Sequence, residues 1–248
     1  MRFSNRAFLV TGGTSGIGLA TAQRLVAEGG RVLATGRSPE HIDEARATLP
    51  DATIIAHDAA DASATDTLAE AVREFAPEGL DGAFLNAGIG RFKTLDAIDA
   101  DEFDQHFDLN VRAPMLQAQA LAPLMKDGGA LLLIGSGTVG GGRADTLVYA
   151  ASKSAIRQAA RSLASQFAPR RIRVNVVAPG ATETRFHTRG GMSDADLAEY
   201  KAKLSHTIPL GRLGKPEDVA GVACFLLSDD AAYVTGSEYR VDGGLTMA

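Results

Sequence analysis

The sequence predicts an α/β fold, a doubly wound sheet of mostly parallel strands with helices on both faces. Short runs rich in Val, Ile, Leu and Ala, bounded by Gly, Asp, Asn or Pro, alternate with longer amphipathic stretches. Such apolar runs are typical of strands buried on both faces of a parallel sheet. A glycine-rich turn directly follows the first run, at the position where sheets of this kind bind ligands. The alternation of strand and helix implies right-handed crossovers.

Each apolar run is expected to form one strand and each amphipathic stretch one helix. The strands are expected at Ala7–Val10, Arg31–Thr35, Thr53–Ala56, Asp81–Leu85, Ala130–Ile134, Arg173–Ala178 and Glu238–Val241. The helices are expected at Ile17–Glu28, Pro39–Thr48, Ala64–Phe75, Asp101–Lys126, Tyr149–Ala168 and Pro216–Ser228. We expect one domain over residues 1–248, with the polar region Thr182–Lys215 as an inserted flap.

Charge and composition exclude several classes of protein. The chain has 25 Lys and Arg against 30 Asp and Glu, a net charge of −5, which argues against a binder of nucleic acid or anionic lipid. Its one cysteine, Cys224, cannot form an intrachain disulfide, and no Cys/His cluster has the spacing of zinc ligands. No apolar run approaches the roughly 18 residues of a membrane span, and the N-terminus leaves no room for a signal peptide. We expect a soluble, cytoplasmic protein without a metal.

The turn after the first predicted strand has the composition of a phosphate-binding loop. Glycines let a chain turn sharply and let backbone N–H groups approach a pyrophosphate, which then sits at the positive end of the following helix. The context is a strand before the turn and a helix after it, as such a site requires. The alternative is a tight turn without a ligand. The candidate cofactor residues here are Gly12, Thr14, Ser15, Gly16, Ile17 and Gly18.

The end of the second predicted strand bears on which dinucleotide would bind. An acid about 20 residues after the glycines usually binds the ribose 2′-hydroxyl of NAD, but Arg37 and Ser38 stand there. Arginine suits a 2′-phosphate, so we favour NADP(H), and NAD(H) with Arg37 stacked on adenine is the alternative. Asp58, after the third strand, is placed to accept from the adenine amino group, although an ordinary loop aspartate would look the same.

Tyr149 and Lys153 are four residues apart and therefore lie on one face of the predicted helix. Tyrosine ionises near pH 10, and a neighbouring ammonium is expected to lower the tyrosine pKa enough for proton transfer. Ser136, at the end of the fifth strand, has a hydroxyl that could hold a substrate oxygen. The alternative for the pair is an ordinary solvated helix surface.

Together these residues resemble the short-chain dehydrogenase/reductase family in its single-domain form. The resemblance covers essentially the whole chain and is strongest to bacterial carbonyl reductases, secondary alcohol dehydrogenases and 3-oxoacyl-carrier-protein reductases. It includes Asn86-Ala87-Gly88, Asn110, Asn175, Pro179-Gly180, Thr184 and the ending Val241-Asp242-Gly243-Gly244. It implies a Rossmann-like sheet of seven strands in the order 3-2-1-4-5-6-7.

The resemblance also implies roles for these positions. Asn86, Ala87 and Gly88 would support the sheet and line the adenosine side of the cofactor. Asn110 would be the fourth catalytic residue and anchor a water leading to Lys153. Pro179, Gly180, Thr182 and Thr184 would meet the nicotinamide, with Thr184 on its carboxamide. Relatives commonly carry an aliphatic residue in place of Thr182, and many NADP-using relatives carry a basic residue where Thr14-Ser15 stand.

The expected activity is reversible hydride transfer between a nicotinamide and a ketone or secondary alcohol, with Tyr149 as general acid and base. A 3-oxoacyl-thioester reductase or a sugar or steroid dehydrogenase is the alternative within the family. A non-redox epimerase or dehydratase, or a cofactor-binding regulator, is a more distant one.

The substrate walls are expected at Ile89–Lys93, Gly137–Leu147 and the flap. Arg185, His187 and Arg189 on the flap could meet an anionic substrate or simply form a solvated face. From the resemblance we expect a homotetramer, or else a dimer, assembled through the helices at Asp101–Lys126 and Tyr149–Ala168.

Overall fold

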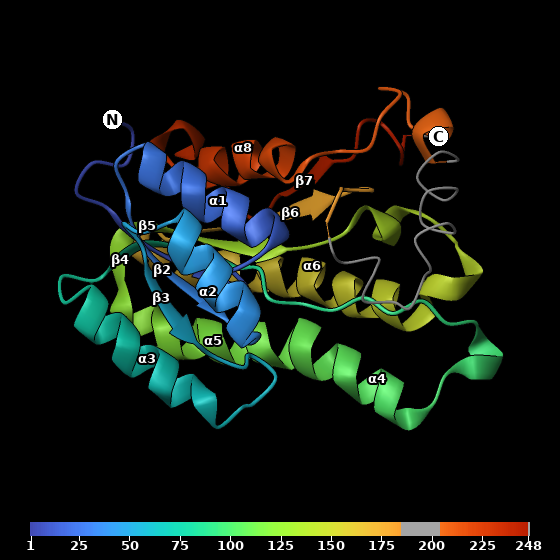
Figure 1. Ribbon diagram of the computed structural model, residues 1–248, viewed down its shortest axis with the longest axis horizontal. Coiled ribbons are helices and arrows are strands. Elements are labelled where there is room, and N and C mark those ends of the chain that lie inside the picture. Colours follow the sequence, from blue (N-terminus) through green and yellow to red (C-terminus); the bar gives the residue numbers. More distant parts are fainter. Residues whose placement is uncertain (185–203, 248) are drawn as a thin grey trace.

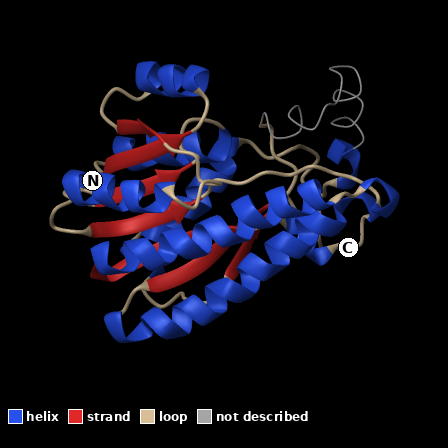
Figure 2. Ribbon diagram, turned by 90° about the horizontal axis from the view of Figure 1, so that it is seen from below, coloured by secondary structure: helices blue, strands red, loops and turns tan. Residues whose placement is uncertain are grey.

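The computed structural model, which describes residues 1–184 and 204–247, is built on one parallel sheet (Figures 1 and 2). The sheet has seven strands in the order β3-β2-β1-β4-β5-β6-β7, and every neighbouring pair is parallel. This confirms the predicted fold class and strand order. The strands are β1 (Ala7–Thr11), β2 (Arg31–Gly36), β3 (Thr53–Ala56), β4 (Leu80–Leu85), β5 (Met125–Ile134), β6 (Arg173–Pro179) and β7 (Glu238–Val241).

Helices cover both faces of the sheet, and the central strand β1 is buried over its whole length (Figure 1). Side chains alternate between the faces along a strand, as the pleat requires. In β1, Phe8 and Val10 pack on one face while Leu9 packs on the other. The first face carries α1 (Gly16–Ala27), α2 (Pro39–Thr48) and α8 (Pro216–Leu227). The second carries α3 (Ala64–Phe75), α5 (Ala113–Leu121) and α6 (Leu147–Phe167).

The predicted helix Asp101–Lys126 is wrong as a single element. The structure divides it into α4 (Ala100–Phe107), a π-helical turn (Asp108–Arg112) and α5, and the chain already enters β5 at Met125. The π turn carries Asn110, whose buried side chain bonds to the backbone of Ile89, and π turns are common at functional sites. Pro123 lies in a 3₁₀ turn that ends the helical stretch, since proline cannot continue an α-helix.

Two glycines let the first strand–helix–strand unit close tightly. A Cβ atom on Gly18 would lie 2.2 Å from the carbonyl oxygen of Gly12, so only glycine lets α1 pack on the turn before it. A Cβ atom on Gly36 would lie 2.2 Å from Oγ1 of Thr14. Thr14 is consequently buried against the end of β2.

The contact between Gly36 and Thr14 generates the first prediction. Gly36→Ala is expected to destabilise the protein by roughly 1–3 kcal/mol, because the added methyl group overpacks a site already filled by the threonine. Chemical denaturation measures the effect. The matched control is Gly142→Ala, where a Cβ would meet nothing within 4 Å, so its stability should stay within about 0.5 kcal/mol of the wild type. Equal stability of the two variants would contradict the packing argument.

Candidate active site

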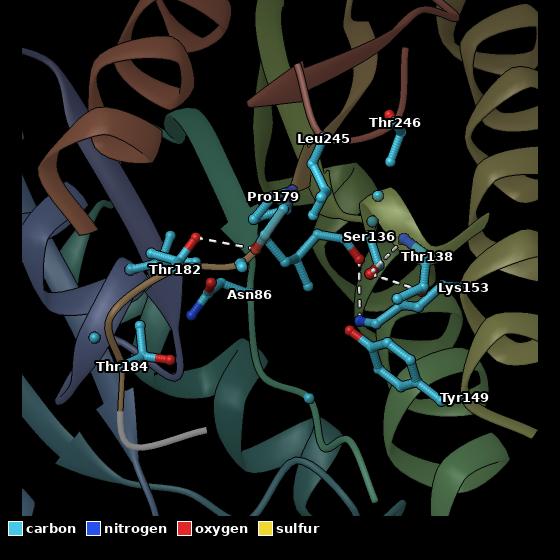
Figure 3. A pocket seen from close by; sticks show the side chains of 18 of the residues that line it. Asn86, Ser136, Thr138, Tyr149, Lys153, Pro179, Thr182, Thr184, Leu245 and Thr246 are labelled. Carbon is cyan, nitrogen blue, oxygen red and sulfur yellow. Dashed lines mark hydrogen bonds between the residues drawn. The ribbon is translucent and has the colours of Figure 1, made fainter. Parts of the chain in front are cut away.

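A cavity of about 420 Å³ opens at the carboxyl ends of the strands, between β1 and β4, where the strand order reverses. This is the position at which open α/β sheets bind their ligands. The cavity is lined by the turn after β1 and by the segments that follow β4, β5 and β6, and Figure 3 shows the side chains that face it. Residues far apart in the sequence therefore meet around one space.

The turn after β1 ends at the N-terminus of α1, and this end of the helix faces the cavity through Ser15, Gly16 and Ile17. No side chain caps the helix and its first turn carries no acidic residue. The first backbone N–H groups of a helix have no partner within the helix, and they carry the positive end of its dipole. Gly12 and Gly16 adopt positive φ values of 62° and 53°, which suit glycine. The arrangement fits a phosphate group.

Hydrogen bonds from the segment after β4 hold this turn in place. The amide of Asn86 donates to the carbonyl oxygens of Thr11 and Gly12, at 3.2 Å each. In return, the hydroxyl of Thr11 accepts from the backbone N–H groups of Asn86 and Ala87, at 3.0 and 3.2 Å. Asn86, Ala87 and Gly88 all line the cavity, as predicted for cofactor-binding residues. The sequence analysis did not single out Thr11 for this bracing contact, because a threonine at a strand end has no distinctive pattern.

Ser136, Tyr149 and Lys153 come together at the opposite side of the cavity (Figure 3). Ser136 follows β5, whereas Tyr149 and Lys153 lie on one face of α6, and all three side chains are buried. The ammonium of Lys153 donates to the carbonyl oxygen of Ile134 at 3.1 Å, and a hydrogen bond joins Ser136 to Tyr149. The alternative of a solvated helix surface is therefore wrong.

Burial dominates the electrostatics of this cluster. It raises the pKa of Tyr149 to about 12, against a smaller lowering by the hydrogen bond with Ser136. It also lowers the pKa of Lys153 to about 7, because a buried ammonium loses its hydration. The pKa of Tyr149 is thus raised by burial, whereas the sequence analysis expected Lys153 to lower it. The Lys153 nitrogen lies 5.9 Å from the centre of the tyrosine ring, and burial removes much of its charge.

Asn110 lies behind the cavity rather than in its lining. Its amide donates to the carbonyl oxygen of Ile89 and to the hydroxyl of Ser152, which itself donates to the carbonyl oxygen of Tyr149. A Cβ atom on Gly88 would lie 2.9 Å from the Asn110 side-chain oxygen and 3.3 Å from the Lys153 nitrogen. Asn110 is therefore packed beside the lysine, although the two are 43 residues apart in the sequence.

Most of the predicted cofactor residues line the cavity, and five do not. Pro179, Gly180, Thr182 and Thr184 line it from the segment after β6. Thr14 and Gly18 instead pack within the first strand–helix–strand unit, and Ser38 precedes α2. Arg37 and Asp58 lie beyond the lining, with a guanidinium nitrogen 3.7 Å from a carboxylate oxygen. The Arg37 side chain is 72% exposed, so it can reach a group at this edge of the sheet.

The lining of the cavity includes residues from the predicted substrate walls and a further segment that was not predicted. Phe92, Thr138, Gly141, Arg143 and Leu204 belong to the three predicted walls. Arg185, His187 and Arg189 lie outside the described residues. Leu245 and Thr246 also line the cavity, and the sequence analysis did not single them out.

The Asp242 carboxylate holds this C-terminal wall by accepting from the backbone N–H groups of Gly244 and Thr246, at 2.9 and 3.1 Å. Within residues 1–184 and 204–247 no cluster of His, Cys, Asp and Glu could hold a metal ion. No helix in the same ranges combines the length and apolar character needed to cross a membrane.

Comparison with known proteins adds independent evidence. Residues 12–246 match the family model described as "Enoyl-(Acyl carrier protein) reductase". Oxidoreductase asL5 of Sarocladium schorii is 36% identical over 251 residues, covering 99% of this chain and 98% of that protein. Galactitol 2-dehydrogenase of Agrobacterium fabrum is 33% identical over 266 residues, covering 100% of both. A blue fluorescent protein from a metagenomic library, solved in complex with NADPH, is 34% identical with a TM-score of 0.86, over 99% of each chain.

The match to the family model includes strands β2 to β7, the glycine turn from Gly12 and the cluster of Ser136, Tyr149 and Lys153. This chain belongs to the short-chain dehydrogenase/reductase family of oxidoreductases.

Proposed function

We propose that the protein catalyses reversible hydride transfer between NADP(H) and a ketone or secondary alcohol. The observation that carries this proposal is the buried cluster of Ser136, Tyr149 and Lys153, which shares one cavity with the N-terminus of α1. The cluster can handle a proton at a carbonyl oxygen, and the helix terminus can bind a phosphate. The nicotinamide cofactor supplies the hydride when it is bound. Galactitol 2-dehydrogenase, a relative over the full chain, supports a substrate of the alcohol class.

The residues around the cavity fit a dinucleotide. The N–H groups at Ser15, Gly16 and Ile17 would hold the pyrophosphate, because no side chain caps that helix end. Asn86, Ala87 and Gly88 would line the adenosine side. Pro179, Gly180, Thr182 and Thr184 would lie against the nicotinamide. The hydroxyl of Thr182 donates to the Gly180 carbonyl oxygen at 3.2 Å. The methyl group is therefore the part of this side chain that is left for an apolar contact.

In the direction of reduction, Ser136 and Tyr149 would donate hydrogen bonds to the carbonyl oxygen of the substrate. Tyr149 would then give its proton to that oxygen as negative charge develops on it. The high pKa of Tyr149 keeps the phenol protonated at neutral pH, so the proton is present when it is needed. Lys153 would bind the ribose hydroxyls, and Asn110 would hold the water that resupplies the proton.

Removing the phenolic hydroxyl separates binding from chemistry. Tyr149→Phe is expected to lower kcat for ketone reduction by about 10²–10⁴-fold, the usual contribution of a positioned acid, while the Kd for NADPH stays within about twofold. Stopped-flow or steady-state NADPH oxidation measures kcat, and fluorescence titration measures Kd. Retention of more than a tenth of the wild-type rate would show that another group donates the proton. Tight NADPH binding by the wild type without turnover of any ketone would favour a cofactor-binding regulator.

Arg37 and Asp58 generate a prediction about cofactor preference. Arg37→Ala is expected to weaken NADPH binding about tenfold, equivalent to about 1.4 kcal/mol, and to leave NADH binding nearly unchanged. Asp58→Asn is the matched variant: it removes the carboxylate that competes for Arg37 and is expected to tighten NADPH binding. Fluorescence titrations with both cofactors provide the measurement. Tighter binding of NADH than NADPH by the wild type would reverse the assignment and place Arg37 on the adenine.

Burial of Lys153 also predicts how stability depends on pH. Unfolded Lys153 keeps its proton up to its ordinary pKa of 10.5, whereas in the folded, cofactor-free protein the pKa is about 7. Between these values the unfolded state binds more protons, so the lysine's contribution to stability rises as pH rises.

Lys153→Met is expected to abolish turnover, yet to increase the free energy of unfolding at pH 7 by a few kcal/mol. The difference in free energy of unfolding between Lys153→Met and the wild type should decrease by roughly 2 kcal/mol between pH 7 and pH 9. Urea denaturation of both proteins at the two pH values tests this, and the comparison cancels the titration of every other group. A constant difference would show that Lys153 keeps its proton between pH 7 and pH 9 in both states, so that burial does not lower its pKa.

A further inference from the structure

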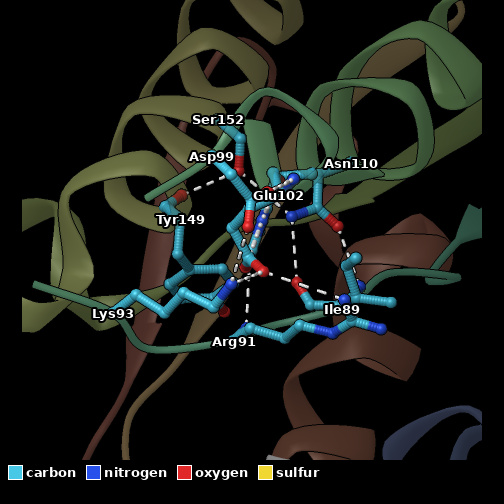
Figure 4. A network of polar contacts seen from close by, with 9 residues as sticks. Ile89, Arg91, Lys93, Asp99, Glu102, Asn110, Tyr149 and Ser152 are labelled. Carbon is cyan, nitrogen blue, oxygen red and sulfur yellow. Dashed lines mark hydrogen bonds and ion pairs between the residues drawn. The ribbon is translucent and has the colours of Figure 1, made fainter. Parts of the chain in front are cut away.

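Residues 89–93 are fastened to the α4 region by three pairs of contacts, which we call the 89–93 ladder (Figure 4). Ile89 exchanges two hydrogen bonds with the Asn110 side chain, both at 2.9 Å. The backbone N–H of Arg91 donates to Nε2 of His106 at 3.1 Å. The ammonium of Lys93 lies 3.1 Å from the Glu102 carboxylate.

The spacing of the ladder follows from the geometry of the two chains. Its members on the helical side, Glu102, His106 and Asn110, are four residues apart and share one face. Four helical residues advance about 6 Å, and two residues of extended chain advance about 6.6 Å. Alternate residues of the segment therefore meet successive turns of the helix. The side chains of Glu102 and His106 are both buried, at 3% and 0% exposed.

The hydrogen bonds of His106 define which of its two ring nitrogens carries the hydrogen atom. Nε2 accepts from the backbone of Arg91 and therefore carries no proton. Nδ1 lies 2.9 Å from the carbonyl oxygen of Glu102 and consequently donates to it. His106 is thus held at both ring nitrogens, and rotating the ring would break the bond to the segment.

Glu102 is a buried carboxylate whose charge is balanced from the segment. Lys93 lies 3.1 Å and Arg91 3.7 Å from its Oε2 atom. Its Oε1 atom lies 3.2 Å from Nδ1 of His106 and accepts no hydrogen bond from the described residues. An unpaired carboxylate at this depth would be strongly unfavourable, so Glu102 holds the two cations and the residue between them in place.

That intervening residue is Phe92, which lines the cavity. Its ring meets the Tyr149 ring edge to face, with centroids 5.6 Å apart and an interplanar angle of 88°. His106 also contacts Tyr149, at a centroid distance of 6.2 Å and an angle of 67°. The ladder therefore sets the position of two rings that pack on the tyrosine.

We propose that His106 and Glu102 are positioning residues for the reaction, acting through Phe92 and the Tyr149 ring. This inference rests on the proposed function, because it assigns Tyr149 the proton transfer. Small displacements of a catalytic group reduce the rate strongly while leaving remote binding interactions intact. A loss confined to the chemical step therefore identifies such a role.

The test compares His106→Leu with His106→Gln. Leucine keeps the apolar bulk but cannot accept from Arg91, and is expected to lower kcat for a ketone at least about tenfold while the Kd for NADPH stays within about twofold. Glutamine can place an oxygen near the position of Nε2, and is expected to restore kcat to within about threefold of the wild type. Asp104→Asn, on the exposed side of α4, is the matched control and should leave kcat unchanged.

A double-mutant cycle tests the route through Phe92. If His106 acts through that ring, Phe92→Leu combined with His106→Leu should be no slower than the slower single variant, since the effects of coupled residues do not add. Additive losses would overturn this route. If His106→Leu does not fold, Lys93→Met tests the contact between Lys93 and Glu102 instead. The same loss of kcat is expected, with the Kd for NADPH again within about twofold.

Each outcome decides the proposal. Wild-type kcat in His106→Leu, or in Lys93→Met where that variant replaces it, overturns the positioning role. An equal loss in His106→Gln, or a parallel loss of NADPH binding, assigns the residue to folding instead. If the wild type reduces no ketone with either cofactor, the proposed function fails. If the wild type is active and the variants are as fast, only the positioning role fails.

Discussion

The hydrogen bonds between Asn86 and the end of β1 are the constraint on which the rest of the site depends. They join β1 to β4 where the sheet order reverses and hold the glycine turn in one conformation. The amide also occupies the space beside Gly18: a Cβ there would lie 2.6 Å from its nitrogen. The N-terminus of α1 therefore faces the cavity because the Asn86 side chain, from the segment after β4, holds the turn by hydrogen bonds. A substitution at any of these positions would change both the conformation of the glycine turn and the packing of α1.

The second constraint is the burial of Tyr149 and Lys153. Dehydration disfavours both the ammonium of Lys153 and the phenolate of Tyr149, so both groups are driven toward their neutral forms. At neutral pH the cost in stability falls on Lys153, because the phenol of Tyr149 is neutral in the folded and the unfolded protein alike. The surrounding structure compensates by fixing the two side chains from several directions. Ile134 accepts from the lysine, while Phe92 and His106 pack on the tyrosine ring.

Several features could be predicted from the sequence because they depend on local patterns. Buried parallel strands are continuous apolar runs, and the seven predicted strands all occur, with boundaries that differ by a few residues or less, except that β5 starts five residues earlier at Met125. The predicted start of β5 is late because the pairing of β4 with β5 is irregular between Leu80 and Gly82. No local sequence pattern predicts such an irregularity. The four-residue spacing of Tyr149 and Lys153 placed both on one helix face, and the glycine turn marked one end of the cavity.

By itself, then, the sequence determined the fold class, the strand order implied by its family motifs, and most of the residues that line the cavity. Only the tertiary structure decided the wall formed by Leu245 and Thr246, the pairing of Arg37 with Asp58, and the ladder from residues 89–93 to His106. It also decided the direction of the pKa changes. Each of these depends on contacts between distant segments or on burial, and neither quantity is encoded in the spacing of neighbouring residues.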